Sequence, residues 1–283
     1  MRLLRTSLVL IASLLGFLGC EDVVDIETPS DRPRFIFDAL IRVDTSQTMT
    51  PVRIEVTETN NFFETIPPAS VAEMMLQNEM TGEQVFLTEV PENSGIYIDT
   101  IPTEFLLRDR LSLQITTANE SYVASASFQP SVPIDSLAVG DGVLIEDETE
   151  LIVSFTDNGS RDDYYLFDFD FSSYLVTEDE FYQGQPFTFS YFYNEELAIG
   201  RKLEISLMGV DKPFYDYMAL LIEQSEPPFG PFETPSVTVR GNFITVPDGT
   251  SVENANPIEN PDAYALGYFA IVQEYKRSIF ITE

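Results

Sequence analysis

The stretch RFIFDALIRV, residues 34–43, decides the fold because apolar residues return at every second position within it. In a β-strand, side chains two residues apart point to the same face of the sheet. The period of two therefore predicts a strand with one apolar face. The residues of that face are Phe35, Phe37, Ala39, Ile41 and Val43.

Further segments of strand-like composition follow this stretch, and turn signals such as Thr81-Gly82 separate them. These segments are Val52–Val56, Val71–Gln77, Gln84–Thr88, Gly95–Ile98, Leu111–Thr117 and Tyr122–Phe128. About seven short strands within about 100 residues are typical of a β-sandwich. We therefore predict an immunoglobulin- or transthyretin-like sandwich over residues 34–129.

The stretch 130–134 is predicted to be a linker, because Pro130 and Pro133 lack the amide hydrogen that a central strand needs. Strand-like composition returns beyond the linker. The segments are Leu151–Phe155, Tyr165–Phe171, Phe187–Tyr193, Leu203–Met208, Leu266–Val272 and Arg277–Ile281. Residues 135–283 are therefore predicted to form a second β-rich domain.

One helix is predicted near residues 213–224 of the second domain. Asp211 can cap its first turn, and Pro213 suits the first helical positions. The apolar residues at helical spacing are Phe214, Tyr217, Met218, Leu221 and Ile222. The predicted fold class is thus mainly β, with two β-sandwich-like domains and one helix in the second.

The first twenty residues follow the pattern of a bacterial lipoprotein signal. Two arginines precede an apolar run over residues 7–18, which is shorter than the roughly 20 residues of a membrane span. The motif Phe17-Leu18-Gly19-Cys20 resembles a lipobox, in which the cysteine is acylated and begins the mature protein. Residues 1–19 are therefore predicted to be the signal peptide and Cys20 the lipid attachment site. The alternatives are a buried free cysteine and an ordinary signal peptide that contains one.

Residues 20–33 are rich in acidic residues and prolines, and they are predicted to form a tether between the anchor and the fold. Acidic residues directly after a lipobox cysteine resemble the surface-export signals of some outer-membrane lipoproteins. We therefore expect a lipid-anchored protein of the outer membrane, exposed at the cell surface and held through the acylated Cys20.

Composition excludes several classes of function. The net charge of −32 repels nucleic acid, whose binding depends on lysine and arginine. Histidine is absent and Cys20 is the single cysteine, so histidine triads and thiolate metal sites are excluded. A hydrophobic fraction of 44% is ample for packed cores. We predict a non-enzymatic protein without catalytic residues, metal ligands or a cofactor.

Three groups of acidic residues are candidate sites: Glu146–Glu150, Glu178–Glu180 and the loop Asp157–Asp163. The loop lacks the ligand spacing of a helical calcium motif, so a polar turn between strands is the favoured interpretation. The other two groups are interpreted as solvated loops. Glycosidases need only two carboxylates, so a carboxylate-dependent hydrolase stays open as an alternative function.

Two short motifs, Asp99-Thr100-Ile101 and Asp135-Ser136-Leu137, resemble the acceptor of one bacterial O-glycosylation system. The acceptor hydroxyls would be those of Thr100 and Ser136. Thr100 and Ser136 are therefore candidate modification sites.

The order of motifs along the chain resembles the domain-of-unknown-function 4249 family of lipoproteins. The carrying segments are Pro33–Ile41, Pro51–Phe63, Val132–Leu137, Asp163–Tyr165, Leu203–Leu221, Pro231–Pro235 and Ala265–Phe269. The resemblance implies an outer-membrane lipoprotein that accompanies TonB-dependent receptors, and it implies no catalytic residues. The leading hypothesis is a non-enzymatic accessory or binding component of such an uptake system. A surface adhesion or structural module is the second hypothesis.

Overall fold

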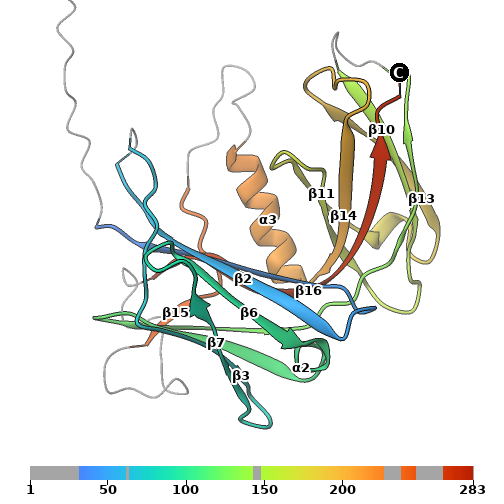
Figure 1. Cartoon of the computed structure of the whole chain (residues 1–283). Helices are drawn as coiled ribbons and strands as arrows, with labels where there is room; N and C mark the ends of the chain where they lie inside the picture. Colours follow the sequence, from blue (N-terminus) through green and yellow to red (C-terminus); the bar gives the residue numbers. More distant parts are fainter. Residues whose placement is uncertain (1–31, 62–63, 143–147, 226–236, 247–263, 283) are drawn as a thin grey trace, which may run out of the picture. The chain divides into compact units, whose positions relative to one another are not determined.

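The computed structural model describes residues 32–61, 64–142, 148–225, 237–246 and 264–282. The ribbon in Figure 1 shows that the described chain is mainly β, which confirms the predicted fold class. The predicted signal peptide, Cys20 and nearly all of the tether lie outside the described residues. None of the helices in the described ranges has the length and apolar character needed to cross a membrane.

An eight-stranded sheet is the central layer. Its order is β12 (Tyr174–Glu178), β11 (Tyr164–Asp168), β14 (Lys202–Val210), β16 (Leu266–Phe280), β1 (Phe35–Val43), β2 (Met49–Glu58), β6 (Ile96–Pro102) and β5 (Thr88–Glu89). The strands β1 and β16 run parallel, whereas the other neighbours in this sheet are antiparallel.

Two smaller sheets and the helices complete the described fold. The five-stranded sheet is β15 (Ile244–Val246), β8 (Ser121–Ser127), β7 (Arg110–Thr116), β3 (Glu73–Asn78) and β4 (Gln84–Phe86). The three-stranded sheet is β13 (Pro186–Tyr193), β10 (Thr149–Thr156) and β9 (Ile134–Val139). The helices are α2 (Thr103–Leu107), α3 (Lys212–Ser225) and the 3-10 turn η1 (Asp179–Phe181).

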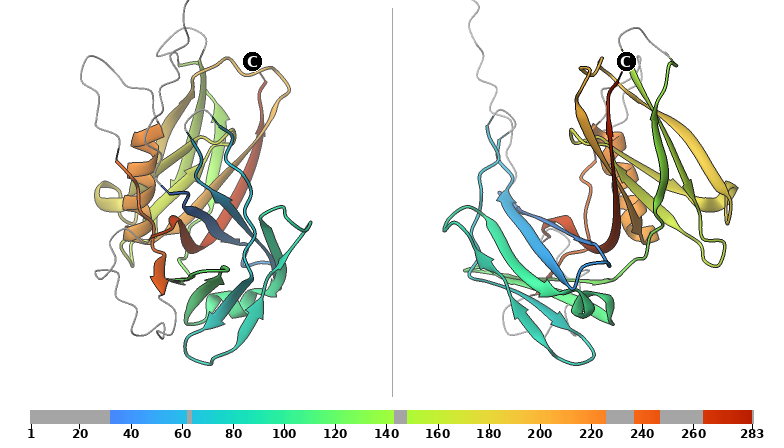
Figure 2. Two further views of the ribbon diagram at one scale, coloured as in Figure 1. Left: turned by 90° about the vertical axis from the view of Figure 1, so that its left-hand side faces the viewer. Right: turned by 45° about the vertical axis from the view of Figure 1, so that its right-hand side comes forward.

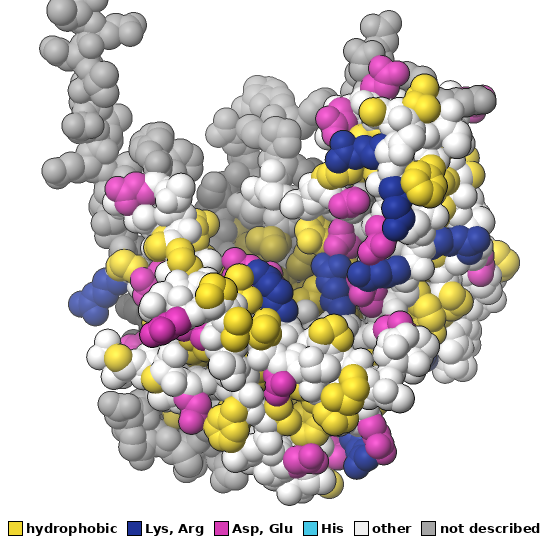
Figure 3. Space-filling view, in the orientation of Figure 1, with side chains coloured by type: hydrophobic (Ala, Val, Ile, Leu, Met, Phe, Trp, Pro, Cys, Tyr) yellow, Lys and Arg dark blue, Asp and Glu magenta, His cyan; other side chains and the backbone are white. Residues whose placement is uncertain are grey.

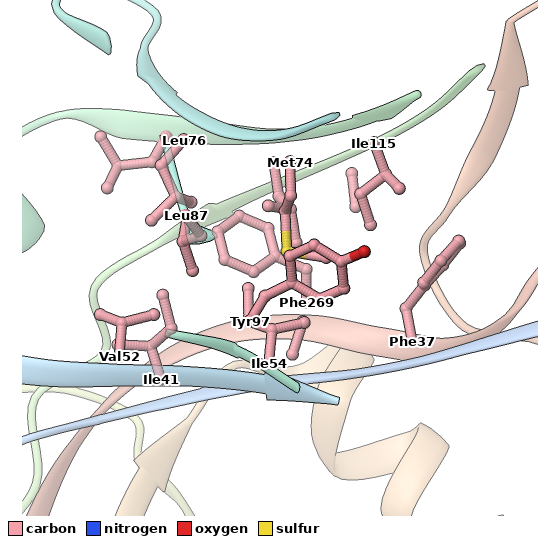
Figure 4. Close-up of a cluster of buried hydrophobic side chains, with 14 of the residues drawn as sticks. Phe37, Ile41, Val52, Ile54, Met74, Leu76, Leu87, Tyr97, Ile115 and Phe269 are labelled. Carbon is pink, nitrogen blue, oxygen red and sulfur yellow. The ribbon is translucent and has the colours of Figure 1, made fainter. Parts of the chain in front are cut away.

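The predicted alternation of β1 places one face of the strand in the first core. Phe37, Ala39 and Val43 have no exposed surface, and Ile41 has 1%. This core lies between the five-stranded sheet and strands β1, β2, β6 and the start of β16. Figure 4 shows its labelled side chains pointing toward one another from these layers.

A second core, rich in aromatic residues, lies between the three-stranded sheet and strands β11, β14 and the end of β16. The rings of Phe155 and Tyr165 meet edge to face at 5.3 Å, and Phe169 stacks on Tyr191 at 3.8 Å. The predicted strand over 165–171 ends at Asp168, because residues 170–172 take positive φ values, which extended strands do not contain.

The helix α3 covers the opposite face of the eight-stranded sheet. Phe214 and Met218 of α3 pack against a third cluster, whose sheet residues are Leu166, Met208, Val210, Ala270 and Val272. In Figure 1, α3 lies on one side of β11 and β14, and β10 and β13 lie on the other side. The further views in Figure 2 show α3 and the five-stranded sheet on different sides of β1 and β2.

The last strand corrects the prediction of two closing strands over 266–272 and 277–281. One strand of 15 residues, β16, runs through the polar interval between them. Its first half pairs with β1 as far as Gln273, and its second half pairs with β14 from Glu274 onward. The backbone pairing therefore continues where the apolar pattern stops, and β16 contributes side chains to both sandwich cores.

The predicted helix near 213–224 is confirmed as α3. Its first turn is capped by Asp211, whose Oδ1 accepts a hydrogen bond from the amide of Phe214 at 2.9 Å. The predicted linker over residues 130–134 includes the first residue of β9, Ile134, and Ser131 within it is buried. The amide of Ser131 donates to Oε1 of Gln273 at 2.9 Å. The domain bounds themselves stay a prediction.

Candidate binding groove

A groove of about 820 Å³ lies between α3 and the exposed face of β1. Residues from β1, β2, β11, β12, α3, the segment 237–239 and the start of β16 line it. We name it the helix groove. Figure 3 shows the surface hollowed near the centre of the view, with hydrophobic side chains deep in the hollow and basic side chains at its rim.

The floor of the helix groove follows from the alternation of β1. Because the odd-numbered residues of this strand fill the first core, the even-numbered residues face the other side of the sheet. Ile36, Asp38, Leu40 and Arg42 all line the groove. A single strand thus presents two apolar, one acidic and one basic side chain to the same space.

One wall of the helix groove is aromatic. The rings of Phe214 and Tyr268 lie 4.8 Å apart between centroids, and those of Tyr217 and Tyr268 lie 4.9 Å apart. Burial raises the pKa of the Tyr268 phenol above its ordinary value, with a further contribution from the charge of Asp211. Burial likewise raises the pKa of Tyr217, and the charge of Asp38 adds to it. Both phenols therefore stay neutral at physiological pH.

The two arginines of the groove each have carboxylate partners. Nη1 of Arg42 lies 2.9 Å from Oδ2 of Asp168 and 3.2 Å from Oε1 of Glu274. Arg53 on β2 forms a more exposed pair with Glu55, in which Nη2 and Oε2 lie 2.8 Å apart. Their positive charges are therefore balanced within the protein itself.

Asp38 is the charged lining residue whose charge has no ion-pair partner among the described residues. Its side chain is exposed, and no hydrogen bond or ion pair joins its carboxylate to another described residue. In the sheet register it lies beside Tyr268 on one side and beside Glu55 on the other. The carboxylate therefore sits between an aromatic ring and a second acidic side chain.

The helix groove has the size and lining that are typical of a binding site. Among the described lining residues Asp38 is the one acidic side chain, whereas carboxylate-based hydrolysis uses two that face each other. Large apolar clefts with a few polar groups are typical of binding sites, and about 820 Å³ falls within their usual range of roughly 300–1,000 Å³. We take this groove as the candidate functional site.

The acidic loop Asp157–Asp163 is a turn whose two buried carboxylates bind side chains and backbone of the protein. The hydroxyl of Tyr165 lies 2.6 Å from Oδ1 of Asp157 and 3.1 Å from Oδ2 of Asp163. Nε of Arg161 contacts both carboxylate oxygens of Asp163, and the amide of Gly184 donates to Asp157. Within the described ranges, no group of three or more acidic or cysteine side chains is arranged to hold a metal ion.

The remaining predicted site residues that the structure describes do not line the helix groove. Thr100 on β6 and Ser136 on β9 are both exposed, and neither lines the helix groove. Cys20 lies outside the described residues, as do Glu146 and Asp147. Within the described residues, neither candidate glycosylation site therefore contributes to the groove, which is a site that the motifs alone did not reveal.

Comparison with known proteins gives a family. The sequence model of a family described as a domain of unknown function (DUF4249) matches residues 21–278. No curated protein matches the chain. A crystal structure of red sea bream transglutaminase is similar at 12% sequence identity and a TM-score of 0.20, over 64% of this chain and 29% of that chain. A likeness of that size carries no argument about fold or activity.

Proposed function

We propose a binding function for this chain, which belongs to the family described as a domain of unknown function (DUF4249). It is a non-enzymatic accessory or binding lipoprotein of a TonB-dependent uptake system, and the helix groove is its binding surface. The observation that carries this proposal is the groove itself, which combines a partly buried aromatic wall with an unpaired carboxylate.

The anchor is proposed from the sequence. The apolar run before Cys20, and the lack of any second cysteine to pair with it, support acylation at this residue. Two or three acyl chains hold a protein on a membrane, because each buried methylene adds about 0.8 kcal/mol. Mass spectrometry of the mature N-terminus should find an acylated Cys20. An unacylated N-terminus that begins elsewhere would contradict the anchor.

The receptor partnership is tested by co-purification. The full-length protein, expressed in its own host and mildly solubilised, should bring a TonB-dependent receptor with it. A Cys20→Ala variant should leave the membrane fraction and lose most of that receptor, because the two proteins would no longer share a membrane. Recovery of the native protein without any such receptor would contradict the proposed partnership.

Measurements of nutrient uptake and of cell attachment distinguish this proposal from the hypothesis of a surface adhesion module. Deletion of the gene should slow growth on a nutrient that the partner receptor imports, and it should leave cell attachment unchanged. Normal uptake together with weakened attachment would instead favour the adhesion hypothesis.

A further inference from the structure

We propose that the helix groove binds an extended polypeptide segment in which one lysine or arginine is flanked by apolar side chains. The inference rests on the proposed binding function and names the chemistry of its ligand. The cation of the segment pairs with Asp38. The flanking side chains lie on the apolar floor and against the aromatic wall.

We infer the charge of the ligand from which charged side chains of the groove already have ion-pair partners. Arg42 and Arg53 are already paired with acidic side chains, so an anionic ligand would have to compete with them. Asp38 has no such partner among the described residues, and Glu55 lies next to it in the sheet register. The net charge of −32 adds a long-range field that attracts cations.

The aromatic wall suits the same kind of ligand. Tyr268 lies beside Asp38 in the sheet register, and its ring contacts those of Phe214 and Tyr217. An ammonium or guanidinium group near a tyrosine face is attracted by the ring quadrupole. A cation at Asp38 can therefore meet a carboxylate and an aromatic ring together.

The shape of the groove favours an extended segment. Residues of α3 line it from Phe214 to Gln224, which corresponds to about 15 Å of helix. An extended chain rises about 3.3 Å per residue, so about four or five residues fit along this length. Ile36, Leu40 and Leu266 supply the apolar floor against which alternate side chains of such a segment pack.

The test uses the full mature protein and three capped pentapeptides of leucine that differ at the central residue. This residue is lysine, norleucine or glutamate, and binding is measured by fluorescence anisotropy at physiological salt. The lysine peptide should bind best. Asp38→Asn should weaken its binding about three- to fivefold, as expected for the loss of one exposed ion pair.

Glu223→Gln is the matched control, because Glu223 is an exposed acid of α3 that does not line the groove and the change in charge is the same. It should leave the affinity unchanged within about twofold. A second variant, Leu221→Arg, places a cation within the groove and should weaken the lysine peptide more than the glutamate peptide. Circular dichroism spectra should match for all variants.

The inference is overturned if the three peptides bind equally, if none binds, or if Asp38→Asn and Glu223→Gln have the same effect. Its failure is distinguishable from failure of the proposed function. Equal binding of the three peptides, together with a receptor that still co-purifies, would overturn the ligand chemistry alone. Peptide binding that depends on Asp38, without any co-purified receptor, would leave the ligand chemistry intact and contradict the receptor partnership.

Discussion

Nη1 of Arg42 on β1 donates a hydrogen bond to Oδ2 of Asp168 on β11, which lies three strands away in the same sheet. The bond is 2.9 Å long and joins residues separated by 126 positions in the sequence. The same nitrogen also contacts Glu274 on β16 at 3.2 Å. Burial would lower the pKa of Arg42, but the hydrogen bond to Asp168 and the charges of both acids raise it. This ion pair therefore joins the strands of the first core to those of the second.

Removing this cation should destabilise the fold. Arg42→Met leaves Asp168 and Glu274 without it, and their side chains are only 17% and 8% exposed. Because Arg42 is itself 30% exposed and Glu274 keeps Lys276 as a partner, we expect a loss of about 1–3 kcal/mol in the free energy of unfolding. Urea denaturation measures it.

The control for this prediction is Arg110→Met, which removes a more exposed cation 3.6 Å from Glu79. Its cost should stay below about 0.5 kcal/mol. Adding Asp168→Leu to Arg42→Met should restore part of the lost stability, because the unpaired carboxylate is gone. If Arg42→Met and Arg110→Met cost the same, the bond between β1 and β11 does not stabilise the fold.

Gly267→Ala should disrupt the pairing of β1 with β16. Gly267 has a φ of +91°, and a Cβ atom there would collide with the backbone carbonyl of Phe37 on β1. The positive φ alone costs an alanine about 1–2 kcal/mol, and the collision must also displace a central strand. We therefore expect a loss of at least about 3 kcal/mol in the free energy of unfolding.

Gly82→Ala separates the effect of the positive φ from the effect of the collision with Phe37. Gly82 also has a positive φ, at +74°, but a Cβ atom there meets nothing within 4 Å. Its cost should be about 1 kcal/mol, the conformational part alone. Equal midpoints of thermal unfolding for the two variants would show that the contact between Gly267 and Phe37 is unimportant.

Much of the fold could be predicted from local sequence because strands and helix carry their own periodicity. The alternation along β1 and the capped amphipathic pattern of α3 are both visible within a dozen residues. The strand β9 was missed because its residues follow two prolines and only Ile134 is buried. The strand β12 was missed because all five of its residues are half-buried and show no alternation.

The helix groove could not be predicted, because it depends on pairings between distant segments. The parallel pairing of β1 with β16 brings Asp38 beside Tyr268, and no local pattern specifies that register. One signal was available: Asp38 and Arg42 interrupt the second face of β1, which otherwise reads Ile36 and Leu40. A strand with charged and apolar residues on its second face is expected to be partly covered on both sides.

The cap of α3 should stabilise the wall of the groove. Asp211→Ala removes the oxygen that accepts a hydrogen bond from the amide of Phe214. We therefore expect a loss of about 1 kcal/mol in the free energy of unfolding. The control is Asp216→Ala, whose carboxylate pairs with Lys212 in an exposed position and should cost less than about 0.5 kcal/mol. Similar costs for the two variants would contradict the cap.

Tyr165→Phe should destabilise the second core at neutral pH. The Tyr165 side chain has no exposed surface, and its hydroxyl is the donor to Asp157 and lies within hydrogen-bonding distance of Asp163. Removing that donor leaves buried carboxylate oxygens less well satisfied, which costs about 1–3 kcal/mol. Tyr191→Phe is the control, because it makes the same chemical change on a half-buried ring, and it should cost less than about 0.5 kcal/mol.

Alkaline pH gives a second test of the Tyr165 hydroxyl, because it removes the proton that the hydroxyl donates. Burial raises the pKa of Tyr165, and the hydrogen bond to Asp157 and the negative charges of Asp163 and Asp157 raise it further. An unfolded tyrosine ionises near pH 10, so the stability from the protonated hydroxyl is fully present below about pH 10 and declines above it. Ionisation of other buried tyrosines also lowers the stability at high pH. The informative quantity is therefore the difference in the free energy of unfolding between wild type and Tyr165→Phe. That difference should be largest at pH 7 and should narrow by pH 11, measured by urea denaturation at each pH. A constant difference would mean that the hydroxyl is not held protonated by the buried acids around it.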